Sequence, residues 1–195
     1  MKRALLSIAI AVTFASCQKD NKENSETATL EFQTKTYEKK TALPCKTAVC
    51  AEVKIVVPEV SNVPVVADSI NKKIFNTVRG IVYFGEKPSD GKTYEEVMAA
   101  FIDSYDKLKE EYADERPGWE AKVEASVAYT SDKILNIKLH NYTFTGGAHG
   151  YDGNRSLIFD KATGKSLEKN DILKDTIAFK VLAEKKFREK FKIPA

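Results

Sequence analysis

The chain has 195 residues, of which 43% are hydrophobic and 30% charged, so it has the composition of a soluble globular protein and enough material for one ordinary domain or two small ones. Without Lys2 and Arg3, which lie in a segment that we expect to be removed, the 31 basic residues fall to 29, against 28 acidic ones. This balance takes away the electrostatic support that nucleic-acid binding usually has, and no nucleic-acid partner is expected.

Residues 1–16 have the pattern of an export signal. A basic start is followed by an apolar run, which is too short to span a membrane, and by small residues before Cys17. The segment resembles a bacterial lipoprotein signal whose lipobox is Phe14 to Cys17, with phenylalanine in the place of the usual aliphatic residue. The resemblance implies that Cys17 is lipidated and anchors the protein to a membrane. A plain secretory signal cut nearby is the alternative.

Residues 17–29 are polar and contain no aromatic residue, so they are predicted to form a flexible tether. The start of this tether, Gln18 to Asp20, is similar to the export signals that place Bacteroidetes lipoproteins on the outer face of the outer membrane. We therefore expect a cell-envelope protein that is lipid-anchored at the outer membrane, on its periplasmic or surface face.

Two further cysteines, Cys45 and Cys50, lie close together in the sequence. Because an exported protein meets an oxidising environment, these two are predicted to form a local disulfide. A metal site would need further ligands, and the nearest histidine, His140, lies far along the chain. No metal and no cofactor are expected.

Two strands are predicted near the start of the globular part, over residues 30–37 and 49–57. In the second strand every other residue is apolar and is expected on one buried face, and Pro58 is expected to end the strand.

Two amphipathic helices are predicted next. Residues 67–80 have apolar side chains at helical spacing and end in a glycine. The second helix is expected to begin with a capping box of Thr93 and Glu96. Its apolar stripe, which we assign to the core rather than to a cofactor site, consists of Val97, Phe101, Tyr105, Leu108 and Tyr112.

A long antiparallel hairpin follows. Apolar and polar residues alternate over residues 119–129, residues 130–132 form a turn, and residues 133–144 return. The side chains predicted to lie on the buried face of the first strand are Trp119, Ala121, Val123, Ala125, Val127 and Tyr129.

The remaining predicted elements are a strand over residues 154–159 and a helix over residues 172–191. The helix ends in basic residues, as helix C-termini prefer. The helical side chains expected to pack on the sheet are Leu173, Ile177, Val181 and Phe187.

Four of the nine glycines fall within residues 144–153, FTGGAHGYDG, around His149. Glycine takes backbone conformations that other residues avoid, so this segment is predicted to be a sharp turn where backbone or ligand approaches closely. Together with Asp152 and His140, His149 could in principle bind zinc, but the spacing fits no zinc motif. The favoured interpretation is that His149 forms a hydrogen bond within its own turn. Arg155 could offer a planar fork to a carboxylate, although a single arginine at a strand start is more often a surface or pairing residue.

The stretch from residue 142 to residue 175 is YTFTGGAHGYDGNRSLIFDKATGKSLEKNDILKD. It resembles the C-terminal domain shared by RsiV, a lysozyme-sensing anti-sigma factor, and related exported proteins. The matching motifs are the Thr-Gly-Gly-Ala-His turn, the Phe-Asp strand end, the Thr-Gly-Lys turn and the Leu-x-x-x-Asp-Ile-Leu stretch. Residues 30–129 resemble the domain that precedes it in RsiV and that precedes the catalytic domain in the peptidoglycan deacetylase PdaC.

This resemblance implies an α+β fold in which an antiparallel sheet carries helices on one side, in two small subdomains over residues 30–129 and 130–195. Members of this family normally continue past the last helix into further strands. We therefore expect the second subdomain to be incomplete.

The resemblance also implies a non-enzymatic binding protein whose partner is lysozyme or a similar wall-degrading enzyme. A peptidoglycan- or polysaccharide-binding module is the alternative, with Trp119, Tyr142 and Tyr151 as its aromatic contacts, and a hydrolase or deacetylase using His149 is a third hypothesis. The residues predicted to form the binding loop are Gly146, Gly147, His149, Gly150, Tyr151, Asp152 and Arg155.

Overall fold

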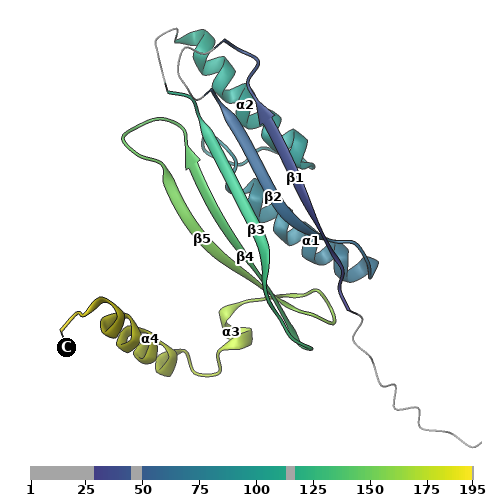
Figure 1. Ribbon diagram of the computed structural model, residues 1–195, viewed down its shortest axis with the longest axis vertical. Helices are drawn as coiled ribbons and strands as arrows, with labels where there is room; N and C mark the ends of the chain where they lie inside the picture. The colour runs from purple at the N-terminus through teal and green to yellow at the C-terminus, as the bar shows by residue number, and fades with distance from the viewer. Residues whose placement is uncertain (1–28, 45–49, 113–116, 195) are drawn as a thin grey trace, which may run out of the picture.

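The computed structural model describes residues 29–44, 50–112 and 117–194, so the predicted signal, Cys17 and Cys45 lie outside the described residues. Within the described part, strands lie side by side in chain order in one sheet (Figure 1). The six strands are β1 (Phe32–Lys40), β2 (Glu52–Val60), β3 (Glu120–Thr130), β4 (Ile134–Phe144), β5 (Tyr151–Asp160) and β6 (Ser166–Leu167).

Neighbouring strands are antiparallel except β2 and β3, which run parallel. A parallel pair needs a long crossover, which two helices supply here: α1 (Pro64–Arg79) and α2 (Tyr94–Glu111). Both helices cover the same face of the sheet, and the short α3 (Lys169–Ile172) and α4 (Thr176–Phe191) follow β6 (Figure 1). The predicted α+β class, with helices on one side of a mostly antiparallel sheet, is confirmed.

One core lies between this face and the two helices, and it extends across the predicted subdomain boundary at residues 129 and 130. That boundary falls in the hairpin between β3 and β4, whose strands pair along most of their length. The large side chains that are fully buried include residues from both sides of the boundary: Trp119, Phe101, Phe159, Ile55, Ile70, Ile74, Leu135, Ile137 and Leu139.

The alternation predicted for β3 is correct for its first half only. Its apolar residues are buried up to Ala125, whereas Val127 is 37% and Tyr129 is 57% exposed. The register with β4 shifts between these two residues, and the tip of the hairpin extends beyond the helices (Figure 1). A bulge changes which face the following side chains occupy, so the simple alternation fails there.

The sequence pattern predicted that Pro58 ends β2, and this prediction is wrong. Pro58 lies inside β2, opposite Thr34. The Glu52 N–H donates to Trp119 O on the β3 side, and residues at even positions along the strand direct their nitrogens to the same side. Pairing with β3 stops at Val56, before the strand reaches Pro58. The sheet therefore loses no hydrogen bond because Pro58 lacks an N–H.

Helix α2 begins at Thr93 as predicted, but the capping contacts differ from the predicted box. The Thr93 hydroxyl accepts from the Glu96 N–H at 3.2 Å, whereas the Glu96 carboxylate accepts from the Lys92 N–H at 2.6 Å. At the other end of the predicted apolar stripe, Tyr112 is 44% exposed because it follows the last helical residue.

The prediction that the C-terminal helix packs on the sheet is wrong for this structure. Helix α4 starts later than expected, at a cap in which the Asp175 carboxylate accepts from two backbone N–H groups, and it contains no buried residue. Its apolar side chains are spread around the helix and form no continuous stripe. The exposed ones are Ile177, Phe179, Val181, Leu182, Phe187 and Phe191. In the part of the chain that the structure describes, no helix is long and apolar enough to cross a membrane.

Candidate functional site

The glycine-rich turn occupies residues 145–150, between β4 and β5. Gly146 and Gly147 have φ values of 106° and 91°, a conformation that L side chains rarely adopt. At Gly150 a Cβ would lie 2.5 Å from ring atoms of Tyr142, so this glycine allows the backbone to pack against the ring. The glycines therefore serve both of the purposes that the sequence suggested.

The predicted binding loop is divided between this turn and β5, which begins at Tyr151, three residues before its predicted start at Asn154. His149 is exposed in the turn, where its Nδ1 lies 3.0 Å from Gly150 O in a hydrogen bond within the turn. Tyr151, Asp152 and Arg155 are strand residues, and strand alternation places Asp152 on the opposite face from the other two.

Asp152 lies on the face of the sheet that α1 and α2 leave open. Its Oδ2 is 2.8 Å from Nε2 of His140, and both side chains are largely exposed. This face carries further cross-strand ion pairs, including Lys54 with Glu38 at 2.7 Å. Within the described ranges, no three His, Cys, Asp or Glu side chains are grouped so that they could hold a metal ion. The two histidines therefore do not converge on one site.

Tyr151 and Arg155 lie on the helix-covered face and line a pocket of about 520 Å³ with Asn141, Thr143, Tyr83 and Phe84. We call it the asparagine pocket. β4 and β5 form one side of this pocket, and the segment that follows α1 forms the other side.

Asn141 is the only polar residue among the described ones that is fully buried. Its side-chain oxygen and nitrogen both lack a hydrogen-bond partner. Opposite it in the register is Gly153, where a Cβ would lie 2.9 Å from Asn141 Oδ1 and 3.1 Å from Tyr151 Cε1. The absence of a side chain at Gly153 therefore makes the space that the amide and the tyrosine ring share.

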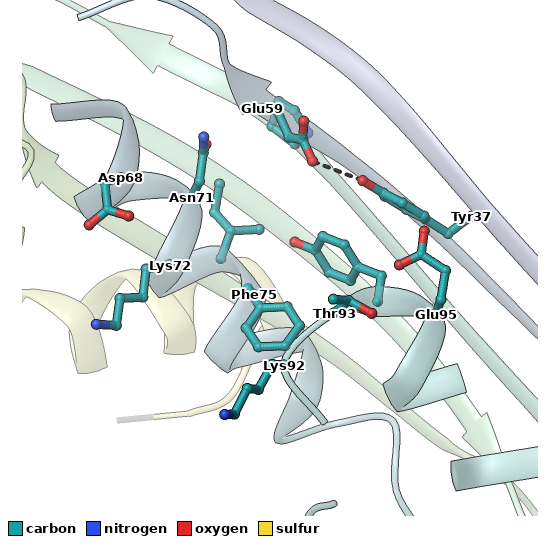
Figure 2. A pocket seen from close by; sticks show the side chains of 12 residues that line it. Tyr37, Glu59, Asp68, Asn71, Lys72, Phe75, Lys92, Thr93 and Glu95 are labelled. Carbon is teal, nitrogen blue, oxygen red and sulfur yellow. Dashed lines mark hydrogen bonds between the residues drawn. The ribbon is translucent and has the colours of Figure 1, made fainter. Parts of the chain in front are cut away.

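A second pocket, of about 510 Å³, lies between β1, β2 and the two covering helices (Figure 2). We call it the tyrosine pocket. Figure 2 shows the Tyr37 hydroxyl directed at Glu59, to which it donates a hydrogen bond of 2.8 Å. The Tyr94 ring lies 4.6 Å from the Tyr37 ring and 5.2 Å from the Phe75 ring, centroid to centroid.

Both phenols of the tyrosine pocket keep their protons at neutral pH. Burial, followed by the hydrogen bond to Glu59, raises the pKa of Tyr37 to about 12. Burial and the nearby Tyr37 raise the pKa of Tyr94 further. Neither phenol is thus prepared to act as a base.

The other polar groups of the tyrosine pocket are paired. Asn71 Oδ1 accepts from the Val60 N–H at 2.9 Å, and its Nδ2 donates to Val60 O at 3.0 Å. The charged residues around this pocket are of both signs: Glu59, Asp68, Glu95, Lys72 and Lys92. Of the two pockets, only the asparagine pocket contains a buried polar side chain with unused hydrogen-bonding capacity.

Cys50 is disulfide-bonded. Its predicted partner, Cys45, lies outside the described residues, so the pairing of these two stays a prediction.

Residues 44–152 match the sequence model of the family described as deacetylase PdaC. The chain belongs to this family. The matched region ends at the start of β5 and so includes β4 and the glycine turn. No curated protein is similar enough in sequence to count as a relative.

Two solved structures of the DUF3298 family share the fold of this PdaC-family chain. A protein from Pseudomonas aeruginosa PAO1 is 23% identical, with a TM-score of 0.61 over 86% of this chain and 70% of that one. A protein from Bacteroides fragilis NCTC 9343 is 21% identical, with a TM-score of 0.65 over 87% of this chain and 72% of that one.

Asn141 and Thr143 line the pocket and were not singled out by the sequence patterns, which placed Gly153, the residue opposite Asn141, in the predicted turn. Asn141 occupies a core position of a strand otherwise filled by leucine and isoleucine, and Gly153 interrupts a strand. A polar residue on an apolar face and an isolated strand glycine each indicate close approach of another group. Asn141 and Gly153 were therefore the features of the sequence that could have indicated this pocket.

Proposed function

We propose that this chain is a non-enzymatic, lipid-anchored protein of the cell envelope that binds a lysozyme-type wall-degrading enzyme. The predicted export signal and the resemblance of residues 142–175 to the C-terminal domain of RsiV support this proposal. Residues 30–129 also resemble the domain that precedes the catalytic domain of the peptidoglycan deacetylase PdaC, which supports an envelope setting, and residues 44–152 match the family model of that name.

The observation that carries the proposal is the turn surface, which we define as Gly147, Ala148, His149 and Tyr151. All four residues are exposed, and the turn projects from one end of the sheet (Figure 1). The two left-handed glycines and the packing of Gly150 on Tyr142 give this turn a defined conformation. A preformed, projecting surface loses little conformational entropy when a protein partner binds it.

The proposal of a binding role rather than an enzymatic one rests on where the histidines lie. A hydrolytic site needs a base, a nucleophile or metal, and an orienting group close together. The hydrogen bond of His149 goes to a neighbouring carbonyl, and the pair of His140 and Asp152 faces the open side of the sheet. Incubation with N-acetylated wall fragments is expected to release no acetate; release that is lost in His149→Ala would overturn this part.

The binding test is a titration of the purified protein against several immobilised lysozymes. We expect saturable binding to at least one, weakened about tenfold by His149→Ala, since a small fraction of contact residues carries most binding energy. His140→Ala is the matched control, because His140 is an exposed histidine on the open face. No saturable binding to any lysozyme type, or equal loss in both variants, would contradict the proposal.

The second candidate is a module that binds peptidoglycan or a surface polysaccharide, and the exposed Tyr151 favours it. Trp119 cannot serve as a contact, because it is 2% exposed and packs against Phe101, Tyr105 and Phe84. Sedimentation with insoluble peptidoglycan separates the two candidates, since a receptor for a protein partner stays in the supernatant.

A further inference from the structure

We propose that the asparagine pocket binds the carboxyl-terminal residue of a peptide, with Asn141 and Arg155 as its recognition groups. This small-ligand site goes beyond the turn surface and holds whether or not a lysozyme binds there.

The Asn141 amide carries the first part of the argument. Its oxygen and its NH₂ group lie side by side, fully buried and without a partner. An amide of this kind is complementary to the N–H and the C=O of one extended residue, which point in the same direction. Asn71 of the same molecule shows this pairing of an amide with one residue: it accepts from the Val60 N–H and donates to the Val60 carbonyl. The unused Asn141 amide fits the last residue of a peptide in the same way, with a carboxylate oxygen in place of the carbonyl.

Arg155 carries the second part. It is the only charged side chain among the described residues that line the pocket, and no described carboxylate forms an ion pair with it. A guanidinium offers donors and no acceptor, in a planar fork that matches a carboxylate. The ligand is therefore an anion, and a carboxylate suits this fork.

The strand register places these two groups within reach of one ligand. Asn141 is paired with Gly153 and Leu139 with Arg155, so Asn141 and Arg155 are diagonal neighbours on the same face of two adjacent strands. Diagonal residues lie within reach of a long side chain. Tyr151 and Arg155 flank Gly153 along β5, and the missing side chain at Gly153 opens a gap opposite the amide. A pocket of about 520 Å³ is within the usual size for a small ligand.

Tyr151 controls access to the amide. Its ring edge and Asn141 Oδ1 border the same space above Gly153, and solvent does not reach the amide in this conformation. The Tyr151 side chain is nevertheless 62% exposed, and exposed side chains change rotamer within nanoseconds. A ligand that takes the place of the ring edge reaches both amide atoms and Arg155.

Two sources supply a peptide carboxyl terminus in a cell envelope: the D-amino-acid ends of wall stem peptides and the L-amino-acid ends of proteins. The test therefore uses acetyl-D-alanyl-D-alanine and acetyl-L-alanyl-L-alanine as probes, together with the carboxamide form of each. Isothermal titration of the purified protein measures the four affinities.

We expect saturable binding of at least one acid, and a loss of about tenfold or more when its carboxylate is replaced by the carboxamide, because a charge-assisted bidentate pair is lost. The better acid identifies the source. Arg155→Met is expected to weaken the acid about tenfold, whereas Lys138→Met, which removes an exposed cation from the open face of β4, leaves its affinity unchanged. Asn141→Leu is expected to abolish binding.

The proposal is overturned if neither acid binds saturably, if acid and carboxamide bind equally, or if Arg155→Met binds like the wild type. Arg155 is exposed, so its variant tests the proposal even if the buried Asn141→Leu protein fails to fold. His149→Ala should leave peptide affinity unchanged, and Asn141→Leu should leave lysozyme binding unchanged. Each proposal can therefore fail without the other.

Discussion

The tyrosine pocket and the asparagine pocket have nearly the same volume, about 510 and about 520 Å³, but they differ in how their polar groups are satisfied. In the first, Asn71 uses both amide atoms on the backbone of Val60, and Tyr37 donates to Glu59. In the second, Asn141 is more deeply buried and uses neither. Volume alone thus does not mark a ligand site; unmet hydrogen-bonding capacity distinguishes the two.

The physical meaning of this difference lies in what each asparagine does for folding. A buried amide without partners destabilises the folded state, whereas one that pairs with two backbone groups stabilises it. Natural proteins tolerate such local conflicts mainly where function requires them. We therefore regard the tyrosine pocket as structural and the asparagine pocket as the functional one.

The largest effect is expected from Tyr94→Ala. Tyr94 is 9% exposed and packs against the rings of Tyr37 and Phe75, so its truncation should lower the free energy of unfolding by about 3 kcal/mol. Tyr151→Ala in the other pocket should change it by less than about 0.5 kcal/mol, since that side chain is mostly exposed. Urea denaturation measures both, and similar losses would remove the structural distinction between the pockets.

The same substitution at the two asparagines should have opposite signs. Asn71→Leu leaves the Val60 N–H and C=O unpaired and should cost about 2 kcal/mol of unfolding free energy. Asn141→Leu removes two unpaired buried atoms and should add about 1 kcal/mol. Thermal and urea unfolding of both variants decide the matter. A clear loss of stability in Asn141→Leu would show that its amide has a partner.

An effect of alkaline pH on stability is expected from the tyrosine pocket. The pKa of Tyr37 is raised to about 12 in the folded protein, chiefly by burial, against about 10 in an unfolded chain. The neutral phenol therefore contributes stability that is fully present below about pH 10 and is lost as the pH rises through about 12.

Because Tyr37 is only half-buried, solvent screening reduces this contribution to about 1 kcal/mol. Unfolding free energies measured from about pH 9 upwards should fall less steeply in Tyr37→Phe than in the wild type. Wild type and Tyr37→Phe are measured side by side, and identical slopes in the two proteins would rule out the contribution of Tyr37.

The smallest effect is expected from Asp152→Asn. Asp152 is next to Gly153 but faces the open side of the sheet, where it pairs with His140 at 2.8 Å in an exposed position. Exposed pairs contribute little, so stability should change by less than about 0.5 kcal/mol, and peptide affinity should be unchanged. A titration in which Asp152→Asn weakens peptide binding would show that recognition is not confined to the helix-covered face.

Several parts of this chain could be predicted from local patterns alone. These parts depend on neighbours within a few residues. They are the helical stripes of α1 and α2, the Thr93 cap, the alternation of early β3 and the need for Gly146 and Gly147. Backbone conformation and burial of one face are set at that range. The family resemblance predicted the class of fold. The helices on one side of the sheet confirm this prediction.

Other features depended on contacts between distant segments. Pro58 lies within β2 because β3 ends its pairing two residues earlier, and α4 remains exposed because its apolar side chains form no single face. The asparagine pocket needs β4, β5 and the segment after α1 to meet. The sequence by itself determined which residues have hydrogen-bonding side chains and which have no side chain. Only the tertiary structure decided that Asn141 and Gly153 face each other, because strand register is a property of paired strands.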